Sequence, residues 1–147
     1  MTHKLILTYT SENEHDGELC ASIESVGYSG QGAAWFNVAQ LQSFCAALAA
    51  FPISSDTPPS LSGGYWNEDG TALVQTHVGL TIAPYNIRGS LLVSVQLSAP
   101  IWELDGHDLH RCVTTHFRTD YPSLDRFRAT LILALEIEGE AATLHGQ

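Results

Sequence analysis

The pattern of hydrophobic and polar residues changes its period at Asn37. Residues 33–36 have the pattern of a strand, whereas apolar residues beyond Asn37 recur at the spacing of one helix face, at Leu41, Phe44, Cys45 and Leu48. Asn37 can cap the first turn, and Gln40 can complete a capping box. The sequence therefore predicts a helix from Asn37 to Phe51, which ends because the residue before Pro52 is pushed out of the helical region.

A second helix is predicted from about Pro122 to Glu138. Its apolar residues share one face, at Leu124, Phe127, Leu131 and Leu135. Pro122 suits a first turn, where a missing amide costs nothing, and Gly139 suits the end of the helix.

The rest of the chain carries the patterns of short strands. The clearest alternation of apolar and polar residues runs from Thr71 to Ala83 and from Ser90 to Ala99. Further strands are predicted at residues 4–10, 19–26, 33–36, 61–66 and 109–118, with a bulge in the glycine-broken segment 61–66. Because the strands come in runs, the sequence predicts one α+β domain over residues 1–147. It would hold a mostly antiparallel sheet of about six or seven strands, packed by two helices.

The composition indicates a folded chain that is not embedded in a membrane. Apolar residues make up 44% of the 147 residues and charged residues 15%, yet no apolar run approaches the ~20 residues of a membrane span. The apolar run near the N-terminus is shorter than the core of a signal peptide. We therefore expect a cytoplasmic protein.

The formal net charge of -10 narrows the choice of partner. It arises from 16 acidic against 6 basic residues, so the chain lacks the basic footprint that nucleic acids and anionic membranes require. An acidic surface favours a basic protein partner, and solubility alone is the other explanation for the charge.

The histidines and cysteines do not have the spacing of a metal site or a disulfide framework. The densest cluster holds His107, His110, Cys112 and His116, but on a strand His116 would lie about 20 Å from His110. Only the first three could converge, and only on a bent loop. We expect cross-strand polar pairs and a small core thiol here, free thiols at all three cysteines, and no metal or cofactor. Cys20 and Cys45 read as small buried hydrophobes.

No catalytic motif is complete. The segment from Gly27 to Gly32 resembles a nucleophile elbow but has Gln31 where the motif requires glycine, and no glycine-rich phosphate loop occurs. Dispersed carboxylates or histidines in a cleft could still form a small hydrolase.

Aromatic residues beside acidic ones form the candidate binding surface. They are Tyr65 and Trp66 with Glu68 and Asp69, and Trp102 with Glu103 and Asp105. Aromatic anchors dominate binding hot spots, while surrounding carboxylates would steer a basic partner. The alternative is that these rings cover the core at strand ends.

Four segments carry a family resemblance. They are residues 30–44 (GQGAAWFNVAQLQSF), 61–64 (LSGG), 88–95 (RGSLLVSV) and 119–127 (TDYPSLDRF). Together they resemble the WapI-type immunity proteins, small bacterial domains in which a strand enters a Leu-x-x-Phe helix and a second helix ends the fold. The last segment departs from that family, which opens this helix with Asp-Gln followed by Ser or Thr. The resemblance implies a toxin-neutralising binding protein and assigns no interface residue.

The function expected from the sequence is therefore protein binding. The chain would be a cytoplasmic binding domain, immunity-like, that neutralises a basic toxin through the aromatic and acidic residues named above. The small hydrolase is the alternative, and the absence of a complete catalytic motif makes it the weaker one.

Overall fold

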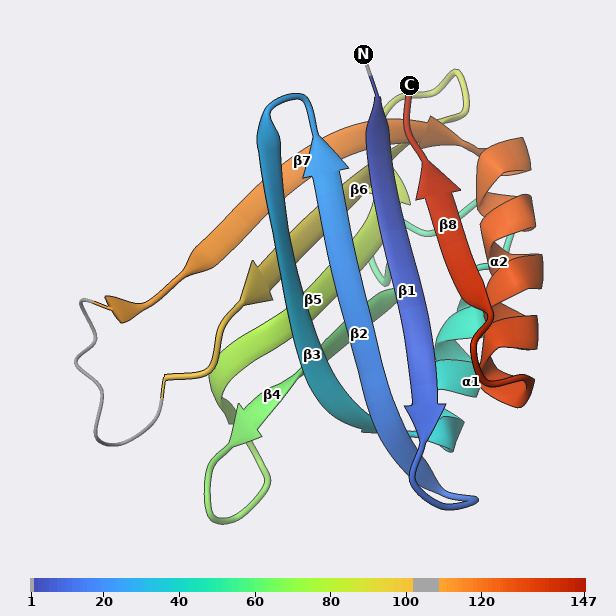
Figure 1. Ribbon diagram of the computed structural model, residues 1–147. Coiled ribbons are helices and arrows are strands. Elements are labelled where there is room, and N and C mark those ends of the chain that lie inside the picture. The colour runs from blue at the N-terminus through green and yellow to red at the C-terminus, as the bar shows by residue number, and fades with distance from the viewer. Residues whose placement is uncertain (1, 102–108) are drawn as a thin grey trace.

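Two four-stranded antiparallel sheets pack face to face in the computed structural model, which describes residues 2–101 and 109–147 (Figure 1). The strand order is β3-β2-β1-β8 in the first sheet and β4-β5-β6-β7 in the second. The elements, in chain order, are β1 (His3–Ser11), β2 (Asp16–Ser25), β3 (Tyr28–Asn37), α1 (Val38–Ala47), β4 (Ser60–Trp66), β5 (Leu73–Pro84), β6 (Ser90–Ser98), β7 (Cys112–Asp120), α2 (Tyr121–Glu136) and β8 (Ala141–His145).

This architecture confirms the α+β class, the antiparallel pairing and the two helices. The strands, however, form two sheets rather than one. After β3 the chain enters α1 and the loop beyond it, so β4 begins a new sheet instead of pairing with β3. Both sheets turn their apolar residues inward, and Leu7, Leu19, Val93 and Leu97 are among the buried residues of one shared core.

The first helix is capped as the sequence predicts but is shorter. The Gln40 amide donates to Asn37 Oδ1 at 2.7 Å, and the Asn37 amide donates to Gln40 Oε1 at 3.1 Å. The helix ends at Ala47 rather than Phe51. Beyond it, the amides of Ala49 and Ala50 bond three residues back, which tightens the chain into a turn.

The second helix starts one residue earlier than predicted and ends at Glu136 rather than Glu138. Asp120 caps it, since its Oδ1 accepts from the Ser123 amide at 2.8 Å, and this bond lowers the pKa of the Asp120 carboxyl. Ile137 is already extended, and Gly139, at φ +93°, turns the chain back.

The turn at Gly139 leads into β8, a strand that the sequence analysis missed. Glu136, Glu138 and Glu140 make the preceding segment polar, and only Ala142 and Leu144 of the strand are buried. β8 pairs with β1, so the two termini lie side by side in Figure 1. Beyond it, the Gln147 amide donates to the Arg118 carbonyl oxygen of β7 at 2.8 Å. The two sheets are thus joined on this side.

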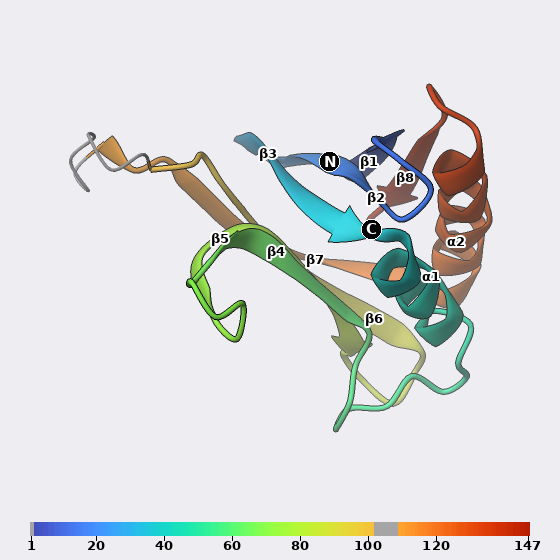
Figure 2. The same cartoon turned by 90° about the horizontal axis from the view of Figure 1, so that it is seen from below.

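Both helices lie together at one side of the two sheets (Figure 2). α2 packs on β8 and β1, and its Leu124, Phe127 and Leu131 are fully buried. Within residues 2–101 and 109–147, no helix is both long and apolar enough to cross a membrane.

Replacing Asn37 with alanine is expected to destabilise the fold by about 1 kcal/mol, because the first helix loses its cap. Urea unfolding followed by circular dichroism measures the change. Gln42→Ala is the matched control, since Gln42 is exposed on the same helix. Equal stabilities of the two variants would contradict the role given to the capping box.

Candidate functional site

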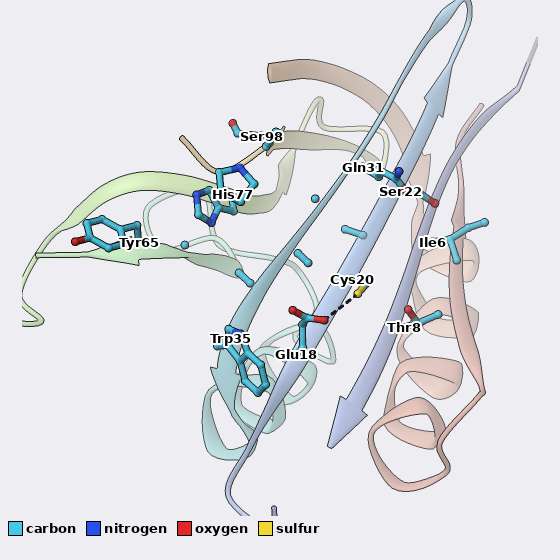
Figure 3. Close-up of a pocket in the computed structure, with 17 residues that line it drawn as sticks. Ile6, Thr8, Glu18, Cys20, Ser22, Gln31, Trp35, Tyr65, His77 and Ser98 are labelled. Carbon is cyan, nitrogen blue, oxygen red and sulfur yellow. Dashed lines mark hydrogen bonds between the residues drawn. The ribbon is translucent and has the colours of Figure 1, made fainter. Parts of the chain in front are cut away.

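An open groove of about 700 Å³ follows the edge of β3 and continues over the outer face of the first sheet (Figure 3). Five consecutive residues of β3, from Gln31 to Trp35, line it. Successive side chains of a strand point to opposite faces, so a cavity that contacts all five must run along the edge of the strand.

The opposite wall comes from the second sheet. It is formed by Gly64 and Tyr65 of β4, His77 of β5, and residues 98–100, which begin at the end of β6. Figure 3 shows Tyr65, His77 and Ser98 on one side of β3, and Glu18, Cys20 and Thr8 on the other.

A β-bulge places His77 in this wall. Gly63 pairs with Val78, whereas Gly64 pairs with Thr76, so His77 is the extra residue of β5. The register shift falls within segment 61–66, where a bulge was predicted, but the extra residue lies on the partner strand β5. The bulge brings the His77 carbonyl oxygen against β3, where a Cβ at Gly32 would lie only 2.5 Å from it.

His77 is held in one tautomer by its neighbour. Its Nε2 lies 3.0 Å from Gln75 Oε1, and because an amide oxygen only accepts, Nε2 carries the proton. The Gln75 side chain also bonds the backbone of Ile101 at both its N–H and its C=O, each at 2.9 Å. Burial lowers the pKa of His77, and the charge of His110 lowers it further. His77 is therefore neutral at neutral pH.

Ser98 supplies a polar atom without a partner. Its side chain is 2% exposed, and its Oγ makes no hydrogen bond within the part of the chain that the structure describes. Burying an unpaired hydroxyl is costly, and because the oxygen itself is closed off from the groove, a bound molecule would not reach it.

The floor of the groove is the outer face of β1 and β2, with Glu18 as its carboxylate. Cys20 lies two residues along β2 on the same face, with Sγ 3.8 Å from Glu18 Oε1. Burial raises the pKa of the Cys20 thiol, and the charge of Glu18 raises it further. The thiol therefore stays protonated near neutral pH.

Two of the three predictions for individual cysteines are wrong. Cys20 is half-buried in the groove rather than in the core, because Leu19 and Ala21 take the inward positions of β2. Cys112, expected as a small core thiol, is exposed at the start of β7. Cys45 is buried as predicted, and all three cysteines are free.

The histidine cluster is dispersed where the structure describes it. His107 lies outside the described residues, and His110 is exposed. His116 forms a cross-strand pair with Ser94 on β6, with Nδ1 and Oγ 2.9 Å apart. In residues 2–101 and 109–147, no three histidine, cysteine or acidic residues are grouped to hold a metal ion.

Four of the seven predicted binding residues gather at the hairpin between β4 and β5. Tyr65 is 54% and Trp66 40% exposed, and Glu68 and Asp69 are exposed beside them. Both rings are therefore accessible to a partner. The other three, Trp102, Glu103 and Asp105, lie outside the described residues.

Trp35 belongs to the same surface but was missed as a candidate. It is 53% exposed and lines the groove from β3, opposite Tyr65 on β4. The signal was strand alternation: with Ala34 and Phe36 facing the core, Trp35 must face outward.

No protein-family model, curated protein or solved structure matches this chain.

Replacing Glu18 with glutamine should speed the alkylation of Cys20 at mildly alkaline pH. The substitution removes a charge that raises the thiol pKa, so the thiolate becomes more abundant. Iodoacetamide labelling resolved by peptide mass spectrometry gives the rate. Glu24→Gln, an exposed change on the same strand, is the control. An unchanged Cys20 rate in Glu18→Gln would contradict the coupling of these two residues.

Proposed function

We propose that the chain is a binding domain for a basic protein partner. The observation that carries this proposal is the placement of Trp35 and Tyr65, exposed aromatic residues of two different sheets, on the same groove. With Trp66 they form what we call the aromatic rim.

The aromatic rim has the properties of a binding hot spot. Aromatic side chains bring a large contact area at a small cost in side-chain entropy, and they dominate the energetics of interfaces. All three residues of the rim lie on strands, so their backbones are ordered before a partner binds. Little further ordering is needed on binding.

The charge around the aromatic rim selects the partner. Glu68 and Asp69 are exposed next to Trp66, and Glu18 lies in the groove. The residues lining the groove in the described part of the chain include neither lysine nor arginine. A cationic partner would be steered toward this surface by a net charge of -10, and salt would screen the attraction.

Neutralisation of a basic toxin is the specific form of this function that the resemblance to WapI-type immunity proteins favours. Such an inhibitor would act in the cytoplasm by covering the cationic substrate-binding face of the toxin. The acidic surface and the exposed aromatic residues suit that role.

The groove supports the hydrolase alternative less well. Burial and Glu18 raise the pKa of the Cys20 thiol, whereas a nucleophilic cysteine needs a lowered pKa. His77 bonds to the Gln75 amide, in place of the carboxylate that orients a typical catalytic base. Neither group is prepared for nucleophilic catalysis.

The partner, tested first among the products of adjacent reading frames, should lose affinity when Trp66 is replaced by alanine. We expect a loss of about 2 kcal/mol or more, because the substitution removes an aromatic anchor that the partner would bury on binding. Glu68→Gln should mainly slow association. Surface plasmon resonance at two salt concentrations measures the association rate and the affinity separately. Binding of the unaltered protein should be weaker at the higher salt concentration.

The control is Tyr85→Ala, since Tyr85 is a 53% exposed aromatic residue just beyond the C-terminal end of β5, away from the β4–β5 hairpin. Its affinity should match that of the unaltered protein. The proposed function would be contradicted if no partner is recovered. It would also be contradicted if the affinity of the partner changes neither with salt nor with Trp66→Ala.

A further inference from the structure

We propose that the partner is held as an extended basic segment that adds a strand to the free edge of β3 in the groove. This inference rests on the proposed function and specifies how the partner is recognised. Three observations carry it: the phase of the β2–β3 ladder, the line of the groove and the position of Glu18.

The turn between β2 and β3 fixes which backbone groups face outward. Val26 and Gly27 both have positive φ, 44° and 86°, as in a two-residue type I′ turn, so Ser25 and Tyr28 form the closing hydrogen-bonded pair. Pairs then alternate along an antiparallel ladder. Every second residue of β3 from position 29 onward therefore turns its N–H and C=O away from β2.

Both ends of the ladder agree with this phase. The Val38 amide donates to the His15 carbonyl oxygen at 2.7 Å, as an inward residue should. The Asn37 amide donates instead to the Gln40 side chain, away from β2. The outward residues between the two ends include Gln31, Ala33 and Trp35.

These three residues line the groove. Their outward N–H and C=O groups make no hydrogen bond to any residue in the described part of the chain. A row of unpaired backbone groups is the template on which an extended peptide adds as a further strand. A helix could not pair with them, because its own backbone groups are already bonded.

The far wall lies directly against β3. A Cβ at Gly32 would lie 3.4 Å from the Ser98 amide nitrogen and 2.5 Å from the His77 carbonyl oxygen. The wall therefore closes one side of the groove along the free edge of β3.

The charge of the added strand follows from Glu18. Glu18 pairs with Trp35 across β2 and β3, and both side chains lie on the outer face. On an added strand, a lysine or arginine next to Trp35 would run its stem over the indole toward the Glu18 carboxylate. Residues on the other face of that strand would meet the wall formed by the second sheet, where Ala99 and Pro100 are apolar. The segment therefore alternates basic and apolar residues.

The charge also argues against a second copy of this chain as the occupant. Pairing of two β3 edges would bring together two chains of net charge -10. A dimer would show directly in size-exclusion chromatography with light scattering.

An octapeptide of alternating valine and lysine, labelled with fluorescein, is the probe. Fluorescence anisotropy should show binding to the unaltered protein and much weaker binding of the valine–glutamate peptide. Ala33→Pro removes an outward amide without breaking the ladder to β2, and it should weaken binding about tenfold. Glu18→Gln should weaken binding several-fold.

Thr114→Pro is the matched control. Thr114 lies on β7, the edge strand of the other sheet, where the Ala99 amide bonds the Arg111 carbonyl oxygen and so sets the same alternation. Its amide also points outward, so the substitution changes a free edge outside the groove. Binding of the peptide should be unchanged, and circular dichroism melting confirms that both proline variants fold.

Peptides methylated on alternate amide nitrogens test the same point with the protein unaltered. Methylation of one alternating set should abolish binding, whereas methylation of the other set should preserve it. Strand addition would be overturned if both methylated peptides bind equally well, or if Ala33→Pro and Thr114→Pro bind the peptide with equal affinity. Dimerisation through β3 would also overturn it.

The two proposals can fail separately. A partner that needs Trp66 but binds Ala33→Pro as tightly as the unaltered protein would preserve the proposed function and reject strand addition. Conversely, binding of the peptide with the expected Ala33 dependence, without any basic protein partner, would leave the edge site standing and remove the proposed function.

Discussion

The close approach of β3 to β5 is the constraint on which the shape of this molecule depends. At Gly32 and His77 the two backbones leave no room for a side chain, and at Gly63 a Cβ would lie 2.6 Å from the Phe36 ring. These contacts let β3 lie directly against the second sheet with Phe36 in the core. His77 is the extra residue of the bulge, and its carbonyl oxygen is the atom that a Cβ at Gly32 would meet at 2.5 Å.

The two sheets are joined at one side of the structure and separate at the other. Near the termini, the sheets are joined through the chain end, where Thr119 Oγ1 donates to the His145 carbonyl oxygen at 2.8 Å. On the opposite side, β3 and β4 are both terminal strands of their sheets and do not pair with each other. Figure 2 shows the sheets diverging away from the helices. The groove lies on this open side, beside the aromatic rim.

Local sequence signals predicted the local structure well. The cap at Asn37, the helix face from Leu124 to Leu131 and the bulge near Gly64 depend on residues a few positions apart, and all three are present. Predictions that needed long-range pairing were wrong or missing. The choice of two sheets over one depends on which strands meet, and the short β8 is a strand only because β1 lies beside it.

In the candidate site, too, the features that depend on neighbouring residues could be predicted, and those that depend on long-range pairing could not. Tyr65 and Trp66 could be named from their acidic neighbours, but the groove joins residues near positions 20, 33, 65, 77 and 98, which no spacing rule connects. Trp35 and Cys20 could have been found from strict alternation along their strands. The pairing that makes the wall from His77 and Ser98 could not.

Amide hydrogen exchange along β3, followed by NMR, tests most directly whether this edge is free. The account predicts alternation: the amides of Gln31, Ala33 and Trp35 should exchange much faster than those of Gly32 and Ala34, which bond to β2. Uniformly slow exchange from residue 31 to residue 35 would show that the edge is covered and would contradict the account.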